Sequence, residues 1–213
     1  MEPAVLQFIE LLAVIAAATF GVLLARRKGM DFVGVFSVAC MTAFGGGTLR
    51  DLFLDRHPLF WIQHEHYPLI VFGLAAVTSL ARRIPKLVER ALYVPDALGL
   101  GLFSVVGTGY ALESGTSWFI ACLLGTITGT FGGVIGDVVC NEVPSLFRSA
   151  PLYATCSFLG CWVYLLLRSV VPQQILAISV GIVLIVLFRL AALYWNIRLP
   201  EFSPADVDDR RGP

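Results

Sequence analysis

The chain has 213 residues, of which 57% are hydrophobic and only 14% are charged, and its mean hydropathy is +0.81. A soluble globular domain carries about 45–50% apolar and about 25% charged residues. Fifteen basic and fifteen acidic residues cancel to a formal net charge of zero, which excludes the basic face that nucleic acid requires. The apolar residues stand in long uncharged blocks. The composition therefore predicts an all-α polytopic membrane protein whose main partner is the lipid bilayer.

The apolar blocks predict seven transmembrane helices. A helix needs about 20 residues to cross the roughly 30 Å hydrocarbon layer. The blocks are continuously apolar rather than alternating, which argues against a lipid-facing barrel. We expect the helices over residues 4–25, 31–54, 67–81, 91–112, 117–140, 151–168 and 172–195.

Basic residues between the blocks predict the orientation. Only Arg56 and Arg168 fall on one side of the membrane in this arrangement. The other side holds Arg26, Arg27, Lys28, Arg82, Arg83, Lys86, Arg90, Arg148, Arg198, Arg210 and Arg211. Short loops rich in Lys and Arg stay in the cytoplasm. We therefore expect the N-terminus outside and the C-terminus in the cytoplasm.

A glycine-rich motif in the second block recurs in the fifth. Residues 44–52 (FGGGTLRDL) resemble residues 130–138 (TFGGVIGDV), and Asp137 follows Asp51 by 86 residues. The same offset pairs Thr42 with Thr128 and Pro58 with Pro144. Three helices per copy is an odd number, so the second copy enters the membrane from the opposite side. We predict two inverted three-helix repeats (1–89 and 90–171), a seventh helix (172–199) and a disordered cytoplasmic tail (200–213).

The glycines of the motif allow two interpretations. Each glycine costs about 1 kcal/mol of helix propensity relative to alanine. Consecutive glycines in mid-span therefore predict a kink or an unwound turn, whose freed carbonyls must face protein or water. Alternatively, Gly125, Gly129 and Gly133 form a small-residue stripe that lets two helices pack closely without a pore. The helix-break glycines of the first interpretation are Gly45, Gly46, Gly47, Gly132, Gly133 and Gly136.

Charged residues beside the glycines form a candidate cation pathway. A charge at the centre of a bilayer costs about 2.5–3.5 kcal/mol, so such residues face protein or water. The candidate pathway residues are Thr48, Arg50, Asp51 and Asp137, and the two aspartates lie about one turn beyond the glycines. Their oxygens, with freed carbonyls, suit permeant potassium or sodium ions. The alternative is a structural ion pair, such as Arg50 with Asp137, that holds the two copies together.

Three further charges lie in or near the apolar blocks. Glu10 and Asp96 match at the same offset and form a possible secondary acidic pair, although we expect them mainly to be packing or interfacial residues. Arg189 lies in the last block, outside the repeat.

Signatures of an enzyme or a metal site are missing from the sequence. It contains no zinc-protease, serine-hydrolase or phosphate-loop motif, so we expect no catalytic residues and no cofactor. His57 lies in the same loop as His64-Glu65-His66, which has no further ligands nearby, and we expect no metal site there. We expect the cysteines to be small apolar residues between helices: Cys40, Cys122, Cys140, Cys156 and Cys161.

Residues 45–52 and 132–138, together with residues 140–144 (CNEVP), resemble the prokaryotic branch of the trimeric intracellular cation (TRIC) channel family. The similarity covers about residues 5–195. It implies a seven-helix protomer with two inverted repeats in a bacterial inner membrane. It also implies a symmetric homotrimer with one potassium-permeable pore through each protomer, lined by the second and fifth helices, which bend at their glycines.

One position departs from the pattern that this resemblance implies. An Arg-Asp pair is expected in the second copy as in the first, but Gly136 precedes Asp137. The positive charge of the motif then rests on Arg50 alone, which predicts a wider or less positive pathway. Some bacterial relatives are regarded as small-solute transporters. The resemblance therefore leaves open a secondary transporter of a small zwitterion such as glycine.

Overall fold

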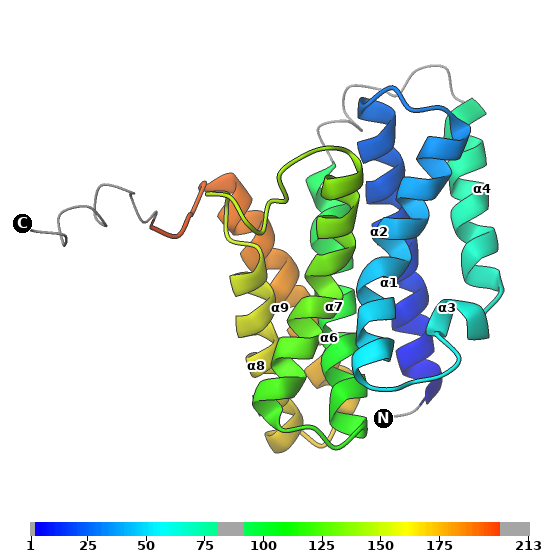
Figure 1. Cartoon of the computed structure of the whole chain (residues 1–213). Helices are drawn as coiled ribbons and strands as arrows, with labels where there is room; N and C mark the ends of the chain where they lie inside the picture. The colour runs from blue at the N-terminus through cyan, green and yellow to red at the C-terminus, as the bar shows by residue number, and fades with distance from the viewer. Residues whose placement is uncertain (1–2, 81–91, 201–213) are drawn as a thin grey trace, which may run out of the picture.

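The computed structural model of the chain describes residues 3–80 and 92–200 (Figure 1). This part of the chain is helical and contains no strand, as predicted for an all-α protein. The helices are α1 (Pro3–Arg27), α2 (Phe32–Phe53), α3 (Phe60–Gln63), α4 (His66–Leu80), α6 (Tyr93–Glu113), α7 (Trp118–Val139), α8 (Ala154–Val170) and α9 (Gln174–Tyr194).

Each predicted range overlaps one long helix, and the helix ends differ from the prediction by three residues at most. The short helix α3 was not predicted. Helices α1, α2, α7 and α9 are long and apolar enough to cross a membrane by themselves, and α4 and α8 are shorter apolar helices. The predicted basic loop with Arg82, Arg83, Lys86 and Arg90 lies outside the described residues, as does the predicted tail from residue 201 onward.

Helices in the two halves of the chain end and begin in the same way. After α1 and α6 the chain turns at Gly29 and Gly115, with φ of 69° and 79°, a conformation that glycine adopts readily. The next helices begin after Asp31 and Ser117, whose side chains accept hydrogen bonds from backbone N–H groups three residues later, at 2.9 and 3.4 Å. Both pairs are separated by 86 residues, the offset predicted from the glycine motifs.

The ends of α2 and α7 also match. Each helix has 22 residues and is followed by a residue in the left-handed conformation, Asp55 with φ of 50° and Asn141 with φ of 56°. Asp and Asn tolerate this conformation better than most residues. The repeated motif is therefore placed on helices with equivalent boundaries.

Helices α2 and α7 cross with their backbones in close contact. A Cβ atom added at Gly46 would lie 2.0 Å from the carbonyl oxygen of Thr128, and one added at Gly132 would lie 2.3 Å from that of Thr42. Both helices continue through these glycines, so the unwound turn is wrong, whereas the alternative of a kink stays a prediction. The glycines allow the close approach predicted from the small-residue stripe, and this packing compensates for their poor helix propensity.

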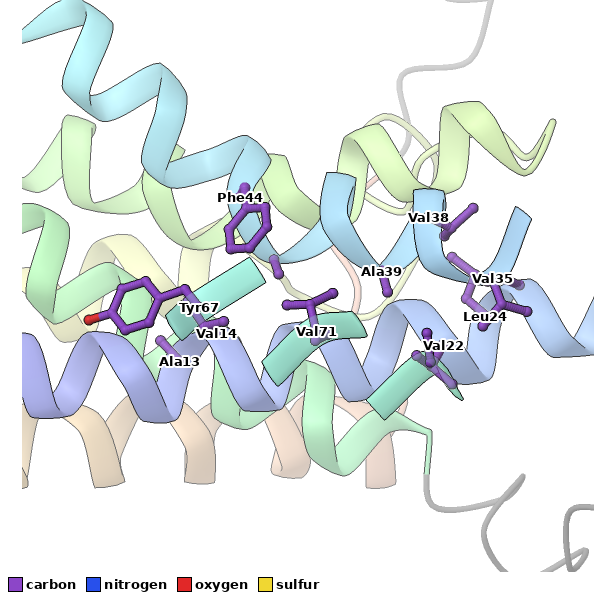
Figure 2. Packing of buried hydrophobic residues seen from close by; sticks show 14 of the residues in the cluster. Ala13, Val14, Val22, Leu24, Val35, Val38, Ala39, Phe44, Tyr67 and Val71 are labelled. Carbon is purple, nitrogen blue, oxygen red and sulfur yellow. The ribbon is translucent and has the colours of Figure 1, made fainter. Parts of the chain in front are cut away.

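Apolar side chains pack on both sides of this crossing. Figure 2 shows the cluster between α1, α2 and α4, which includes Val14, Val38, Phe44 and Val71. A second cluster joins α6, α8 and α9. Helices α1 and α6 pack against each other, as do α2 and α7, and these four lie between α4 on one side and α8 and α9 on the other (Figure 1).

Candidate functional site

A cavity of about 250 Å³, which we name the Glu10 cavity, lies at one end of the α2–α7 pair. It reaches α1 near its start, at Leu6. The charged residues of its wall are Glu10, Asp51, Arg56 and Glu113. Acidic groups therefore outnumber basic groups among the described residues of this wall.

A second cavity of about 260 Å³, which we name the Asp96 cavity, lies near the other end of α1, at Leu24. The acidic residues of its wall are Asp96, Asp137 and Glu142. The basic residues of its wall are Arg27, Lys28, Arg148 and Arg189. Basic groups are therefore slightly in excess among its described residues.

The walls of the two cavities correspond at the 86-residue offset. Glu10 of the first matches Asp96 of the second, and Asp51 matches Asp137. Further matched positions are Leu6 with Leu92, Arg56 with Glu142, Phe60 with Leu146, Leu24 with Tyr110, and Arg27 with Glu113. Equivalent positions of the two copies thus surround two cavities of almost equal volume.

A buried arginine lies behind the Glu10 cavity. Arg50 is fully buried; its Nη1 donates to Glu10 Oε1 at 2.8 Å, and its Nε donates to Asp51 Oδ1 at 2.9 Å. The guanidinium carbon lies 4.5 Å from the centre of the Tyr110 ring. The proposed pairing of Arg50 with Asp137 is therefore wrong. The arginine instead pairs with the carboxylates of its own half, which offset the cost of burying its charge.

Thr48 and Asp51 hold α3 against α2. The backbone N–H of Phe60 donates to Asp51 Oδ2 at 2.8 Å, and Trp61 Nε1 donates to the Thr48 hydroxyl at 3.1 Å. Asp51 is 1% exposed, so its carboxylate is largely occupied by protein partners even though it contributes to the cavity wall.

Beside Asp96, in the wall of the Asp96 cavity, an arginine from α9 takes the role that Arg50 has beside Glu10. Arg189 is 4% exposed; its Nη2 lies 3.4 Å from Asp96 Oδ2, and its Nη1 donates to the carbonyls of Pro151 and Leu152 at 2.8 and 2.9 Å. Its guanidinium carbon lies 4.5 Å from the centre of the Tyr153 ring. Glu10 is therefore a buried ion-pair partner, and Asp96 is a partly buried one. The pairing of Arg189 with Asp96 could not be predicted from the repeat, because Arg189 lies outside it. The one indication in the sequence was an arginine inside an apolar block.

Asp137 differs from Asp51 in its surroundings. It is half-buried, and its Oδ2 accepts a hydrogen bond from the backbone N–H of Ser145 at 3.1 Å. Gly136 precedes it, and a Cβ added there would lie 2.5 Å from Thr42 Cγ2. The missing arginine of the second copy is thus replaced by close contact with α2.

A small cavity of about 20 Å³ adjoins the α2–α7 crossing. Thr42, Thr128 and Gly132 contribute to its wall, and Asp96 and Gly133 belong both to it and to the Asp96 cavity. This volume is close to that of a single water molecule. The small cavity and the Asp96 cavity are therefore neighbours that share part of their walls.

The other motif glycines also serve packing. A Cβ added at Gly45 would lie 2.5 Å from Ile135 Cδ1, and one at Gly47 would lie 2.4 Å from the Phe60 ring. Larger residues would therefore displace α7 or α3 from α2.

The described residues include no group of three or more His, Cys, Asp or Glu that could hold a metal ion. The rings of His64 and His66 lie 5.5 Å apart, and partial burial and the neighbouring His66 lower the pKa of His64. All five cysteines are free thiols; Cys40 is half-buried and the others are buried, as predicted for small apolar residues.

A protein-family model described as "Glycine transporter" matches the chain twice, over residues 7–83 and 93–169. The two matched segments begin 86 residues apart, the same offset as the glycine motifs. Together they cover most of the part of the chain that contains the cavities.

Two curated relatives align along nearly the whole chain. A UPF0126 membrane protein of Vibrio cholerae is 37% identical over 204 residues, which cover 95% of this chain and 85% of the relative. The UPF0126 inner membrane protein YadS of Escherichia coli is 34% identical over 199 residues, which cover 92% of this chain and 95% of YadS.

Solved TRIC channels share the fold. The TRIC channel orthologue from Rhodobacter sphaeroides superposes with a TM-score of 0.84 at 35% identity, covering 91% of this chain and 99% of the orthologue. A prokaryotic TRIC channel crystallised in 0.5 M KCl gives a TM-score of 0.83 at 25% identity, covering 92% of this chain and 99% of that one.

Proposed function

Because the chain belongs to the prokaryotic TRIC channel family and to the family described by the glycine transporter model, we propose that it conducts monovalent cations, chiefly potassium, through a pore in each protomer. It is a multi-pass membrane protein of an inner-membrane family, and its structural neighbours are ion channels rather than enzymes. The permeant ions would be potassium or sodium, without a cofactor.

The proposed pore follows α2 and α7. It runs from the Glu10 cavity past the crossing of these helices to the Asp96 cavity. The observation that carries this proposal is the pair of repeat-related cavities, each with carboxylates in its wall, on either side of one narrow crossing. Carboxylate rings and confined polar cavities are common means of selecting cations. Asp137 would face the ion directly, whereas Asp51, Thr48 and Arg50 would support the wall.

The proposed repeats are inverted, with residues 1–89 and 90–171 as the two copies, 172–199 as the seventh helix and 200–213 as a cytoplasmic tail. The matching helix ends support the duplication. The placement of Leu6 in one cavity wall and its equivalent Leu92 in the other supports the inversion. The distribution of basic residues supports an orientation with the N-terminus and the Glu10 cavity outside.

The proposed assembly is a homotrimer, because the solved orthologue from Rhodobacter sphaeroides is a trimeric channel of the same fold. Mass measurement of the purified protein in detergent tests this assembly. A monomeric or dimeric mass would contradict it.

Single-channel recording of the purified protein in planar bilayers tests the function. With a KCl gradient across the bilayer, we expect unitary currents whose reversal potential lies close to that of potassium. A silent bilayer, or a reversal potential close to that of chloride, would reject the cation channel.

A second candidate is a secondary transporter of a small zwitterion such as glycine. It is favoured by the description of the matching family model and by the presence of both acidic and basic groups in each cavity wall. Uptake of radiolabelled glycine into proteoliposomes separates the two functions. Saturable uptake that depends on an ion gradient would favour the transporter.

A further inference from the structure

Each half of the protomer buries one arginine beside its first-helix carboxylate, but the two arginines differ in origin. Arg50 belongs to the repeated motif and pairs with Glu10 at 2.8 Å. Arg189 belongs to α9, outside the repeat, and lies 3.4 Å from Asp96. Each guanidinium also lies 4.5 Å from the centre of a tyrosine ring. A carboxylate, an arginine and a tyrosine ring therefore lie together in both halves. In the first half the arginine belongs to the repeat, and in the second half it comes from α9.

The two arginines are not equally neutralised. Arg50 lies within 3 Å of two carboxylates, those of Glu10 and Asp51. Arg189 has Asp96 as its carboxylate partner at a longer distance, and otherwise donates to carbonyl oxygens. Each guanidinium has one buried nitrogen without a hydrogen-bond partner among the described residues, Nη2 in Arg50 and Nε in Arg189, so the difference lies in the number and distance of the carboxylates. Less of the positive charge of Arg189 is therefore cancelled locally.

The two arginines also differ in their access to the cavities. Phe60 and Tyr110 contribute to the wall of the Glu10 cavity, whereas Arg50 is not among its described wall residues. Arg189, in contrast, forms part of the wall of the Asp96 cavity, as does Asp137. An ion in the Asp96 cavity would meet the field of Arg189 with little intervening protein, and charge–charge interactions are strong where water is confined.

We propose that Arg189 sets the positive potential of the Asp96 cavity and limits cation passage through it, in the place of the arginine missing at Gly136. This inference rests on the proposed cation channel. Arg189 is a positioning residue for Asp96 and a charge-setting residue for the pathway. Such a field at a pore mouth changes the local concentration of permeant ions by up to several orders of magnitude.

Two opposed substitutions test the proposal in planar bilayers with symmetrical KCl. Arg189→Gln removes the positive charge, and we expect it to raise the single-channel potassium conductance by at least about twofold. Asp96→Asn leaves the arginine without its carboxylate, and we expect the conductance to fall by a similar factor. Arg189→Lys keeps the charge, and its conductance should remain close to that of the wild type.

The double variant Arg189→Gln with Asp96→Asn guards against loss of folding, because it buries no unpaired charge. Its conductance should exceed that of Asp96→Asn, because the positive charge has been removed. If Arg189→Gln keeps the wild-type conductance, or the double variant conducts no better than Asp96→Asn, in channels that still form, Arg189 is purely structural and the inference is wrong. A silent wild-type protein would instead reject the proposed channel function itself, and the inference with it.

Discussion

At the scale of single residues, glycines allow the close approach of α2 and α7. A Cβ at Gly132 would lie 2.3 Å from the backbone oxygen of Thr42, which cannot move without shifting α2. Gly132→Ala should therefore lower the free energy of unfolding by about 1–3 kcal/mol, despite a gain of about 1 kcal/mol in helix propensity. The melting temperature of the detergent-purified protein measures this effect.

Gly73→Ala is the matched control, because an added Cβ at this position of α4 meets nothing within 4 Å in the described part of the chain. This variant should melt at the wild-type temperature or slightly above it. If both alanine variants melt above the wild type, close contact at the crossing does not hold the helices together.

The two motif aspartates should respond differently to neutralisation. Asp51 is 1% exposed and bonds both Arg50 and Phe60, so Asp51→Asn weakens a buried ion pair and should sharply lower the yield of folded protein. Asp137 is half-buried in the wall of the Asp96 cavity, so Asp137→Asn should preserve folding and lower the potassium conductance. Size-exclusion profiles and single-channel recordings of both variants measure these outcomes. If Asp51→Asn folds but conducts less, and Asp137→Asn fails to fold, the ion passes beside Asp51 instead.

The sequence identified these residues but not their partners. The glycines and the two aspartates could be found because the motif recurs at a fixed offset. Which arginine meets which carboxylate depends on how the helices are rotated, and this is decided by packing across helices distant in sequence. The partner of Arg189 was not predicted, because α9 has no counterpart in the repeat with which it could be compared.

At the scale of elements, the long helices were predictable because each coincides with one apolar block bounded by a cap, a glycine or a proline. Helix α3 was not, because its four residues depend on bonds from Asp51 and Thr48 rather than on a pattern of their own. The unwound turn was wrong for a related reason. Intrinsic propensity predicted a break at the glycines, but contact between α2 and α7 stabilises a continuous helix.

A contact at the helix ends predicts a dependence on pH. Lys28, after α1, pairs with Glu142, after α7, and both belong to the wall of the Asp96 cavity. The hydrogen bond from Lys28 and its charge lower the pKa of Glu142, so this carboxylate is ionised at neutral pH and becomes neutral only below its usual range. The pair is therefore complete above the usual glutamate pKa and is lost as the pH falls through the lowered value.

Acidification of the solution that contacts the Asp96 cavity should leave Lys28 unpaired. Its positive charge would then repel cations and lower the cation conductance. Glu142→Gln should show part of this loss already at neutral pH, and its conductance should change less on acidification than that of the wild type. The difference between the two pH profiles isolates Glu142 from Asp96 and Asp137, which also face the cavity. Identical profiles would show that the pair does not influence the pathway.

At the scale of the whole chain, the two cavities have similar volumes and matched wall positions, but some of these positions carry charges of opposite sign. Arg56 of one wall is matched by Glu142 in the other, and Glu113 is matched by Arg27. The Glu10 cavity has three acidic residues and one basic residue, and the Asp96 cavity has three acidic and four basic residues. A duplicated fold has thus become electrostatically asymmetric without losing its matched geometry.

This asymmetry predicts a rectifying pore. Cations concentrate at the more acidic mouth, so the current that carries them from the Glu10 cavity toward the Asp96 cavity should exceed the reverse current in symmetrical salt. Replacing Lys28 and Arg148 together by Gln should bring the ratio of currents at equal and opposite voltages closer to one, because it removes two positive charges from the Asp96 cavity. Arg168→Gln is the control, since Arg168 belongs to neither described cavity wall and should leave the ratio unchanged. Equal currents in the wild type would show that lining charge does not govern ion entry, and the excess of acidic groups in the Glu10 cavity would then serve packing alone.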